Sequence, residues 1–110
     1  MTELVSQHCE ACRHDAPHAT QAEIAEYLPR IPEWEIVEES SVKRLQRVYR
    51  FENFADALAF TTRVGELAES ERHHPSLLTE WGRVRVTWFT MKIKGLHRND
   101  FVMAAKTDRL

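Results

Sequence analysis

Residues 83–90 have the sequence RVRVTWFT, which is a strong strand signal. From Val84 to Trp88 every second residue is apolar, so in an extended chain these apolar side chains point to one face and the residues between them point to the other. The apolar positions are Val84, Val86 and Trp88. Gly82, directly before this stretch, is suited to a turn, and residues 77–81 favour another strand. The region therefore predicts an antiparallel hairpin with one buried face.

A second hairpin is predicted nearer the N-terminus. Residues 34–37 and 42–51 favour strand, and the acidic and serine residues at 39–41 mark the reversal between them. Within the longer strand, Leu45 and Tyr49 share one parity, so they are expected to face the same side of the sheet.

Three helices are predicted around the two hairpins. The first begins at Thr20, which forms a capping-box pattern with Glu23. The second is capped by Asn53 and continues through about Ser70. The last covers residues 99–107, where apolar residues again recur at helical spacing.

The resulting order is helix, two strands, helix, two strands, helix. This order predicts an α+β fold, a four-stranded antiparallel sheet with three helices. A chain of 110 residues with 43% hydrophobic residues suits one domain. We expect that domain to span residues 19–110, with residues 1–18 forming a flexible N-terminal tail.

The middle helix has an unusually wide apolar surface. One stripe consists of Phe54, Ala57, Leu58, Thr61 and Val64, and a second stripe beside it consists of Phe60, Val64 and Leu67. One sheet face does not need that much apolar cover. We expect the first stripe to pack in the core and the second to be available as a subunit interface.

Charge and hydropathy exclude several classes of partner. The chain has 15 basic and 17 acidic residues and a formal net charge of −2, which does not suit a nucleic-acid backbone. The N-terminal region lacks the basic start and apolar run of an export signal, and no later stretch is long enough to span a membrane. We therefore expect a soluble, cytoplasmic protein that binds neither nucleic acid nor membranes directly.

Cys9 and Cys12 form a CxxC pair near the N-terminus, with histidines around it at His8, His14 and His18. Thiolate and imidazole are zinc ligands, so a zinc or redox role is one interpretation. These residues crowd one end of the chain, and there is no further cysteine to complete a distant ligand pair. We therefore favour a reduced tail and expect no metal.

His73, His74 and Pro75 occur where the middle helix must end and a strand must begin. The partial negative charge at a helix C-terminus favours imidazolium, whereas burial in a pocket disfavours it. Two adjacent imidazoles could therefore hold different protonation states near neutral pH, so that one gives a proton while the other accepts one. The alternative is that one ring caps the helix and the other lies in solvent.

Several residues around this pair follow a recognisable spacing, namely Glu69, Pro75, Trp81, Gly95, Leu96 and Asp100. Upstream, IPEW at 31–34 and FENF at 51–54 fit the same pattern. The chain resembles the pterin-4a-carbinolamine dehydratases, also known as dimerization cofactors of a homeodomain transcription factor. The segment HCEACRHDAPH at 8–18 is similar to the bacterial branch that accompanies phenylalanine hydroxylase.

The resemblance implies dehydration of a 4a-hydroxytetrahydropterin to a quinonoid dihydropterin, without metal or organic cofactor, by a homodimer or homotetramer. It implies acid and base roles for His73 and His74, with Glu69 orienting one of them. Pro75, Trp81 and Met91 would line the pterin pocket. The resemblance also implies a link to phenylalanine hydroxylase, whose pterin cofactor the reaction would recycle.

Met91 departs from the family pattern, which has a third histidine at this position. A thioether neither donates nor accepts protons usefully, so catalysis is expected to be slower. His97 could replace that imidazole, or it could simply open the last helix with an exposed ring. Asp100 is expected to stabilise the start of that helix rather than to catalyse. A catalytically weak protein that binds a pterin or regulates a partner is the alternative function.

Overall fold

The computed structural model describes Leu4 and residues 18–110. These residues form three α-helices, four strands and two short 3₁₀ helices. The α-helices are α1 (Gln21–Tyr27), α2 (Phe54–Glu71) and α3 (Arg98–Thr107); the strands are β1 (Glu35–Glu39), β2 (Val42–Arg50), β3 (Ser76–Glu80) and β4 (Arg83–Trp88); the 3₁₀ helices are η2 (Leu28–Arg30) and η3 (Met91–Ile93). The predicted α+β order is confirmed.

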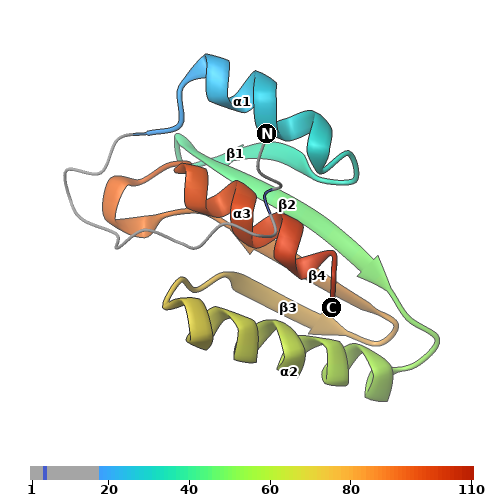
Figure 1. Ribbon diagram of the computed structural model, residues 1–110. Helices are drawn as coiled ribbons and strands as arrows, with labels where there is room; N and C mark the ends of the chain where they lie inside the picture. The colour runs from blue at the N-terminus through green and yellow to red at the C-terminus, as the bar shows by residue number, and fades with distance from the viewer. Residues whose placement is uncertain (1–3, 5–17) are drawn as a thin grey trace.

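The four strands form one antiparallel sheet in the order β1-β2-β4-β3. The tight turn between β3 and β4 depends on Gly82, whose φ of 74° suits glycine. Its carbonyl accepts a hydrogen bond from the N–H of Phe51 at 2.8 Å, and a Cβ on Gly82 would lie 3.2 Å from the Phe51 oxygen. The predicted strand at 83–90 therefore lies inside the sheet (Figure 1).

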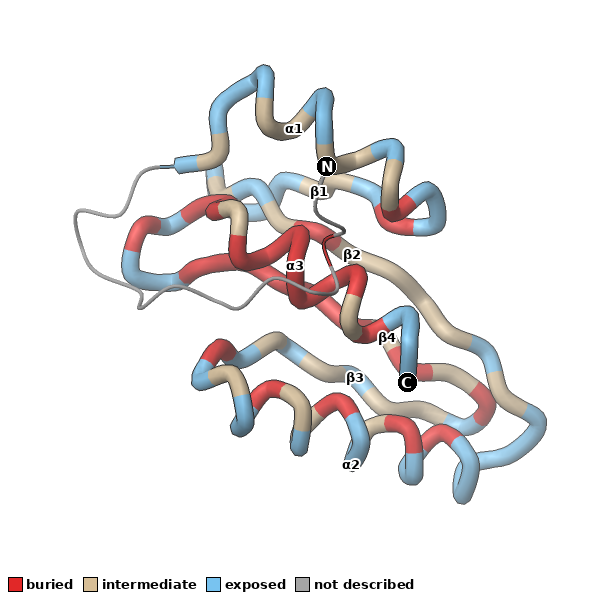
Figure 2. The backbone as a smooth tube through the Cα atoms, in the orientation of Figure 1, coloured by how far each residue is buried: buried red, intermediate tan, exposed pale blue. Residues whose placement is uncertain are grey.

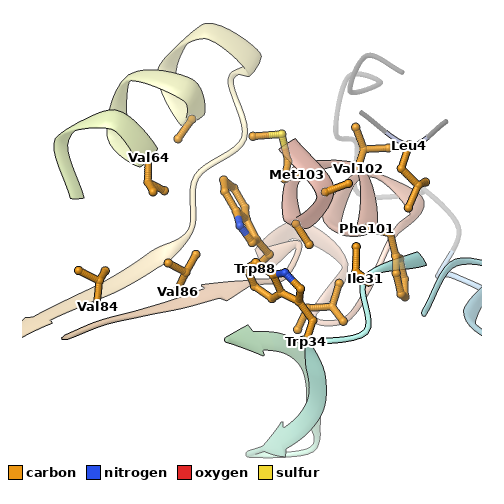
Figure 3. Close-up of a cluster of buried hydrophobic side chains, with 14 of the residues drawn as sticks. Leu4, Ile31, Trp34, Val64, Val84, Val86, Trp88, Phe101, Val102 and Met103 are labelled. Carbon is orange, nitrogen blue, oxygen red and sulfur yellow. The ribbon is translucent and has the colours of Figure 1, made fainter. Parts of the chain in front are cut away.

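The helices cover one face of the sheet, with α2 alongside β3 and β4 and α3 across β2 and β4 (Figure 1). The alternation in β4 is confirmed, because Val84, Val86 and Trp88 are fully buried. Figure 2 shows that burial is concentrated in α3, β4 and the inner side of α2. Side chains from these three elements gather in one core, including Val64, Trp88 and Met103 (Figure 3).

The assignment of the two apolar stripes on α2 was partly wrong: Ala57 and Val64 of the first stripe are buried as expected, but other members of the two stripes exchange places. Phe60 and Val64 are buried, whereas Phe54 and Leu58 are 45% and 49% exposed. Phe60 lies against the rings of Tyr49 and Phe51, with centroids 4.6 and 5.2 Å away. Those aromatic contacts from β2 and the segment after it decide which side of α2 faces the sheet. The outer side of α2, which carries Phe54 and Leu58, is therefore the apolar surface that is free for an interface.

Asp108 connects the C-terminal end of α3 to the region of β1 and β2 through hydrogen bonds. Its carboxylate accepts hydrogen bonds from the Trp34 indole at 3.0 Å, from Arg47 at 2.8 Å and from the Tyr49 hydroxyl. Burial, together with the hydrogen bond to Asp108, raises the pKa of the Tyr49 phenol, so the phenol remains a donor at neutral pH. The helix that carries Asp100 is thereby held at both ends.

The predicted capping box of α1 is present. Thr20 Oγ1 accepts from the Glu23 N–H at 3.1 Å, and Glu23 accepts from the Thr20 N–H at 2.9 Å. We expect Thr20→Ala to lower the free energy of unfolding by about 1 kcal/mol, measured by urea denaturation. Thr62→Ala is the matched control, because that exposed threonine lies inside α2, where its hydroxyl donates to the Leu58 carbonyl and caps no helix start. An equal loss in both variants would contradict a capping role.

Two residues of the proposed N-terminal tail are described. Leu4 is buried in the core, and His18 Nε2 lies 2.6 Å from the Ile93 carbonyl oxygen. The predicted CxxC pair, with His8 and His14, lies outside the described residues. Within the part of the chain that the structure describes, no helix has the length and apolar character needed to cross a membrane.

Candidate active site

The end of α2 sets the direction of the two histidines. Arg72 adopts the left-handed conformation, with φ of 54°, and its N–H bonds carbonyls of the last turn. The His73 N–H donates to the Ala68 carbonyl at 3.1 Å, which completes a Schellman-type ending. Pro75 then prevents further helix. The chain turns sharply, and the two imidazoles separate into different surroundings.

His73 is buried, with 5% of its surface exposed. Its Nε2 lies 2.7 Å from Oδ1 of Asp100, and its ring is nearly parallel to the Trp88 indole, with an angle of 6° and centroids 5.7 Å apart. Trp88 is fixed in turn by a hydrogen bond from its indole to Thr107 at 3.1 Å. Because a carboxylate oxygen can only accept, Nε2 of His73 carries the shared proton.

Asp100 has no exposed surface and joins three elements of the site. Besides His73, it accepts from the Thr90 hydroxyl at 2.8 Å and from the His97 N–H at 2.9 Å. The predicted stabilisation of the helix start is therefore present, but the carboxylate also holds a candidate catalytic ring. The His97 ring is buried, so the expectation of an exposed ring was wrong. Its Nδ1 accepts from the Asn99 N–H at 3.0 Å and caps α3.

His74 lies in a different environment. Its side chain is 62% exposed, and Nε2 lies 2.5 Å from Oε1 of Glu69. Glu69 lies in the last turn of α2, five residues before His74, so the end of the helix supplies the carboxylate. As with His73, the carboxylate places a proton on Nε2 and fixes the ring orientation. Each of the two adjacent imidazoles thus has its own carboxylate.

A pocket of about 490 Å³ opens beside the two rings. Its lining includes both histidines, Pro75, Phe89 and Met91, of which Met91 is 68% exposed at the edge. This volume is within the usual range for a small-molecule site. The pocket walls combine apolar rings with two groups that can transfer protons.

Trp81 is the one predicted site residue that lies elsewhere. It follows β3 at the hairpin turn, at the opposite end of that strand from Pro75, and is 74% exposed. It does not line the histidine pocket. His97 does not line it either, so its ring does not occupy the place of the missing third imidazole.

Sequence reasoning missed several contributors to the site, among them Arg72, Ser76 and Lys92 in the pocket lining. Phe89 and Thr90 line the pocket, and Trp88 lies beneath His73. The alternation in residues 83–90 did carry a signal, because it placed Trp88 on the inner face. Nothing local indicated that the strand end would lie beside the end of α2, since that depends on the pairing of β3 with β4.

Two imidazoles, each hydrogen-bonded to a carboxylate, therefore lie at one pocket, an arrangement that is chemically able to transfer protons. The chain belongs to the family of pterin 4 alpha carbinolamine dehydratases, whose sequence model matches residues 17–110. The matched segment includes both histidines, Asp100 and all four strands of the sheet.

Similar proteins with the same designation are found in two bacteria. A protein of Nitrosococcus oceani is 58% identical over 110 residues, covering 100% of this chain and 97% of its own length. One of Gloeobacter violaceus is 61% identical over 107 residues, covering 97% and 92% respectively. Both are named pterin-4-alpha-carbinolamine dehydratase as a provisional designation.

A crystal structure from Brucella melitensis has the same fold. It is described as a transcriptional coactivator/pterin dehydratase and superposes with a TM-score of 0.74 at 27% sequence identity. The match covers 84% of this chain and 97% of that one. The architecture and the family assignment therefore agree.

Proposed function

We propose that this chain dehydrates a 4a-hydroxytetrahydropterin to the quinonoid dihydropterin. The observation that supports this most strongly is that one pocket holds two imidazoles, each hydrogen-bonded to its own carboxylate. Family membership supplies the substrate class. An aromatic amino acid hydroxylase, such as phenylalanine hydroxylase, is the proposed source of the substrate.

The reaction requires only proton transfer. An acid donates a proton to the C4a hydroxyl, the C4a–O bond breaks and water leaves, while a base takes the proton from N5 and the electrons of the N5–H bond complete a C4a=N5 double bond. His73 and His74 supply these two functions in our proposal. His74 has Nδ1 available once Glu69 holds Nε2, and its exposure lets it exchange protons with water. Pro75, Phe89 and Met91 would form the apolar walls against the pterin ring.

The position of Met91 offers a direct test of this pocket. We expect Met91→His to raise kcat for dehydration about tenfold or more, because an imidazole there would add a proton-transfer group. Stability should change little, since Met91 is 68% exposed. The rate can be followed by stopped-flow absorbance while a hydroxylase generates the carbinolamine.

Met91→Leu is the matched control, since it changes the side chain without adding a proton-transfer group. It should leave kcat within about twofold of the native value. If the leucine and histidine variants gained equally, the gain would reflect packing and the proposed role of this position would be wrong.

Met91 also supports a second candidate function. With a thioether at this edge of the pocket, the protein could bind a pterin and act chiefly on a partner. Tight pterin binding without turnover, in an otherwise folded protein, would favour that function over catalysis.

We further propose that the chain assembles as a homodimer or homotetramer. Phe54 and Leu58 support this, because they place apolar surface on the outer side of α2. The exposed Trp81 is a second candidate for contact with a neighbouring copy. Its proposed contact with substrate depends on such an assembly.

A further inference from the structure

A second hollow lies on the face of the sheet that the helices leave uncovered. It has a volume of about 280 Å³ and is lined by residues that include Glu39, Arg44, Gln46, Ser76, Arg85 and Thr87. Two guanidinium groups and two hydroxyl groups therefore face one small space. Glu39 is the acidic member of this lining, and it is exposed.

Neither arginine forms an ion pair with any residue that the structure describes. Both are half-buried, and Nε of Arg44 is fully buried without a hydrogen-bond partner among the described residues. A buried donor that lacks a partner is costly, so such groups in native proteins usually have a reason. An anion bound in the hollow would supply the missing acceptor.

The strand register places the two arginines around a polar pair. Gln46 and Thr87 are directly opposite each other, and Gln46 Nε2 donates to Thr87 Oγ1 at 3.2 Å. Arg44 lies two residues before Gln46, and Arg85 two residues before Thr87, in antiparallel strands. Their side chains therefore approach the hollow from opposite sides of this pair. Guanidinium and hydroxyl donors in this arrangement suit carboxylate or phosphate.

The hollow adjoins the histidine pocket. Ser76 lines both spaces. Phe89 lines the histidine pocket, and the guanidinium carbon of Arg44 lies 4.2 Å from the centroid of its ring. A ligand that places its ring beside His73 and His74 can therefore extend a substituent over Ser76 toward the two arginines.

We infer that this hollow binds an anionic group, a carboxylate or a phosphate, at the end of the substrate's side chain. The inference rests on the proposed function and names the substrate class more closely: 4a-hydroxytetrahydropterins with a negatively charged side chain. Arg44 and Arg85 are the specificity residues, and they act on binding rather than on proton transfer.

The test compares kcat/KM for substrates that differ only in the side-chain terminus: a neutral hydroxyl, a carboxylate or a phosphate. We expect the native protein to prefer the anionic substrates at least tenfold. Arg85→Gln and Arg44→Gln should each reduce that preference about tenfold, mainly through KM. Arg50→Gln is the matched control, because Arg50 lies on the same strand and face as Arg44 but outside the hollow. It should retain the native preference.

Failure of the inference can be told apart from failure of the proposed function. Equal kcat/KM for neutral and anionic substrates would overturn the inference and leave the dehydratase function intact. If no substrate is turned over, the proposed function fails, and Kd values for the corresponding oxidised pterins, measured by fluorescence, decide the binding site. Tighter binding of the anionic pterin that is lost in Arg85→Gln would support the site, whereas equal Kd values would overturn it.

Inorganic phosphate distinguishes a substrate group from an independent anion. Phosphate should raise KM for the anionic substrates and leave the neutral substrate unaffected, because it competes only for the hollow. Equal inhibition of both classes would overturn the assignment to the substrate's side chain.

Discussion

The double variant His73→Ala/His74→Ala is expected to lower kcat for dehydration of a 4a-hydroxytetrahydropterin by about 10²- to 10⁴-fold. Protonation of the leaving hydroxyl and removal of the N5 proton each need a proton-transfer group. The pocket supplies two imidazoles, from the adjacent residues His73 and His74. KM should change less, because the apolar walls formed by Pro75, Phe89 and Met91 remain. Initial rates over a range of substrate concentrations separate the two parameters.

His97→Asn is the matched control for this variant. It removes an imidazole that lies outside the pocket, and asparagine is a good helix N-cap, so α3 should still begin correctly. We expect its kcat to stay within about twofold of native. A folded double variant with native activity would contradict the assignment of the two histidines.

Asp100→Ala is expected to lower the free energy of unfolding by about 3–5 kcal/mol. The reason is that His73, the Thr90 hydroxyl and the His97 N–H would all lose a buried acceptor at once. Removing one partner of a buried pair is costly because the remaining groups stay desolvated. Urea denaturation, with the midpoint and slope compared, measures the change.

Asp56→Ala is the control for that prediction, because Asp56 is also in the first turn of a helix but is exposed. It should cost less than about 1 kcal/mol. Asp100→Asn should lie between the two, since an amide oxygen can still accept from some of the donors. A loss below 1 kcal/mol for Asp100→Ala would show that the carboxylate is not the centre of a buried network.

Much of the fold could be predicted because it is encoded locally. The alternation in β4, the capping box at Thr20 and the cap at Asn53 each depend on neighbours within a few residues. The buried side of α2 could not be predicted, because both stripes are apolar and share Val64. The choice depends on Tyr49 and Phe51, which approach Phe60 only after the sheet has formed.

In the candidate site, too, contacts between near neighbours could be predicted and contacts between distant residues could not. The adjacent histidines and Glu69 lie within one short segment, so their proximity could be predicted from helix geometry. The pairing of His73 with Asp100 joins residues 27 positions apart and requires α3 to lie beside the end of α2. Residue spacing indicated a capping role for Asp100 and gave no sign of this second contact.

The hollow on the open face could not be predicted from sequence for a related reason. Arg44 and Arg85 are on different strands and occupy polar positions of the alternation, where charged side chains are ordinary. Only the register of β2 with β4 brings them to the same space, and only burial shows that Nε of Arg44 lacks a partner among the described residues.

The rate at which the native protein dehydrates a 4a-hydroxytetrahydropterin tests the central claim most directly. The carbinolamine is generated in the cuvette by phenylalanine hydroxylase, and its decay is recorded with increasing amounts of this protein and in buffer alone. We predict a decay rate that rises in proportion to protein concentration, well above the rate in buffer. A rate equal to that in buffer at every concentration, with a correctly folded protein, would contradict the proposed activity.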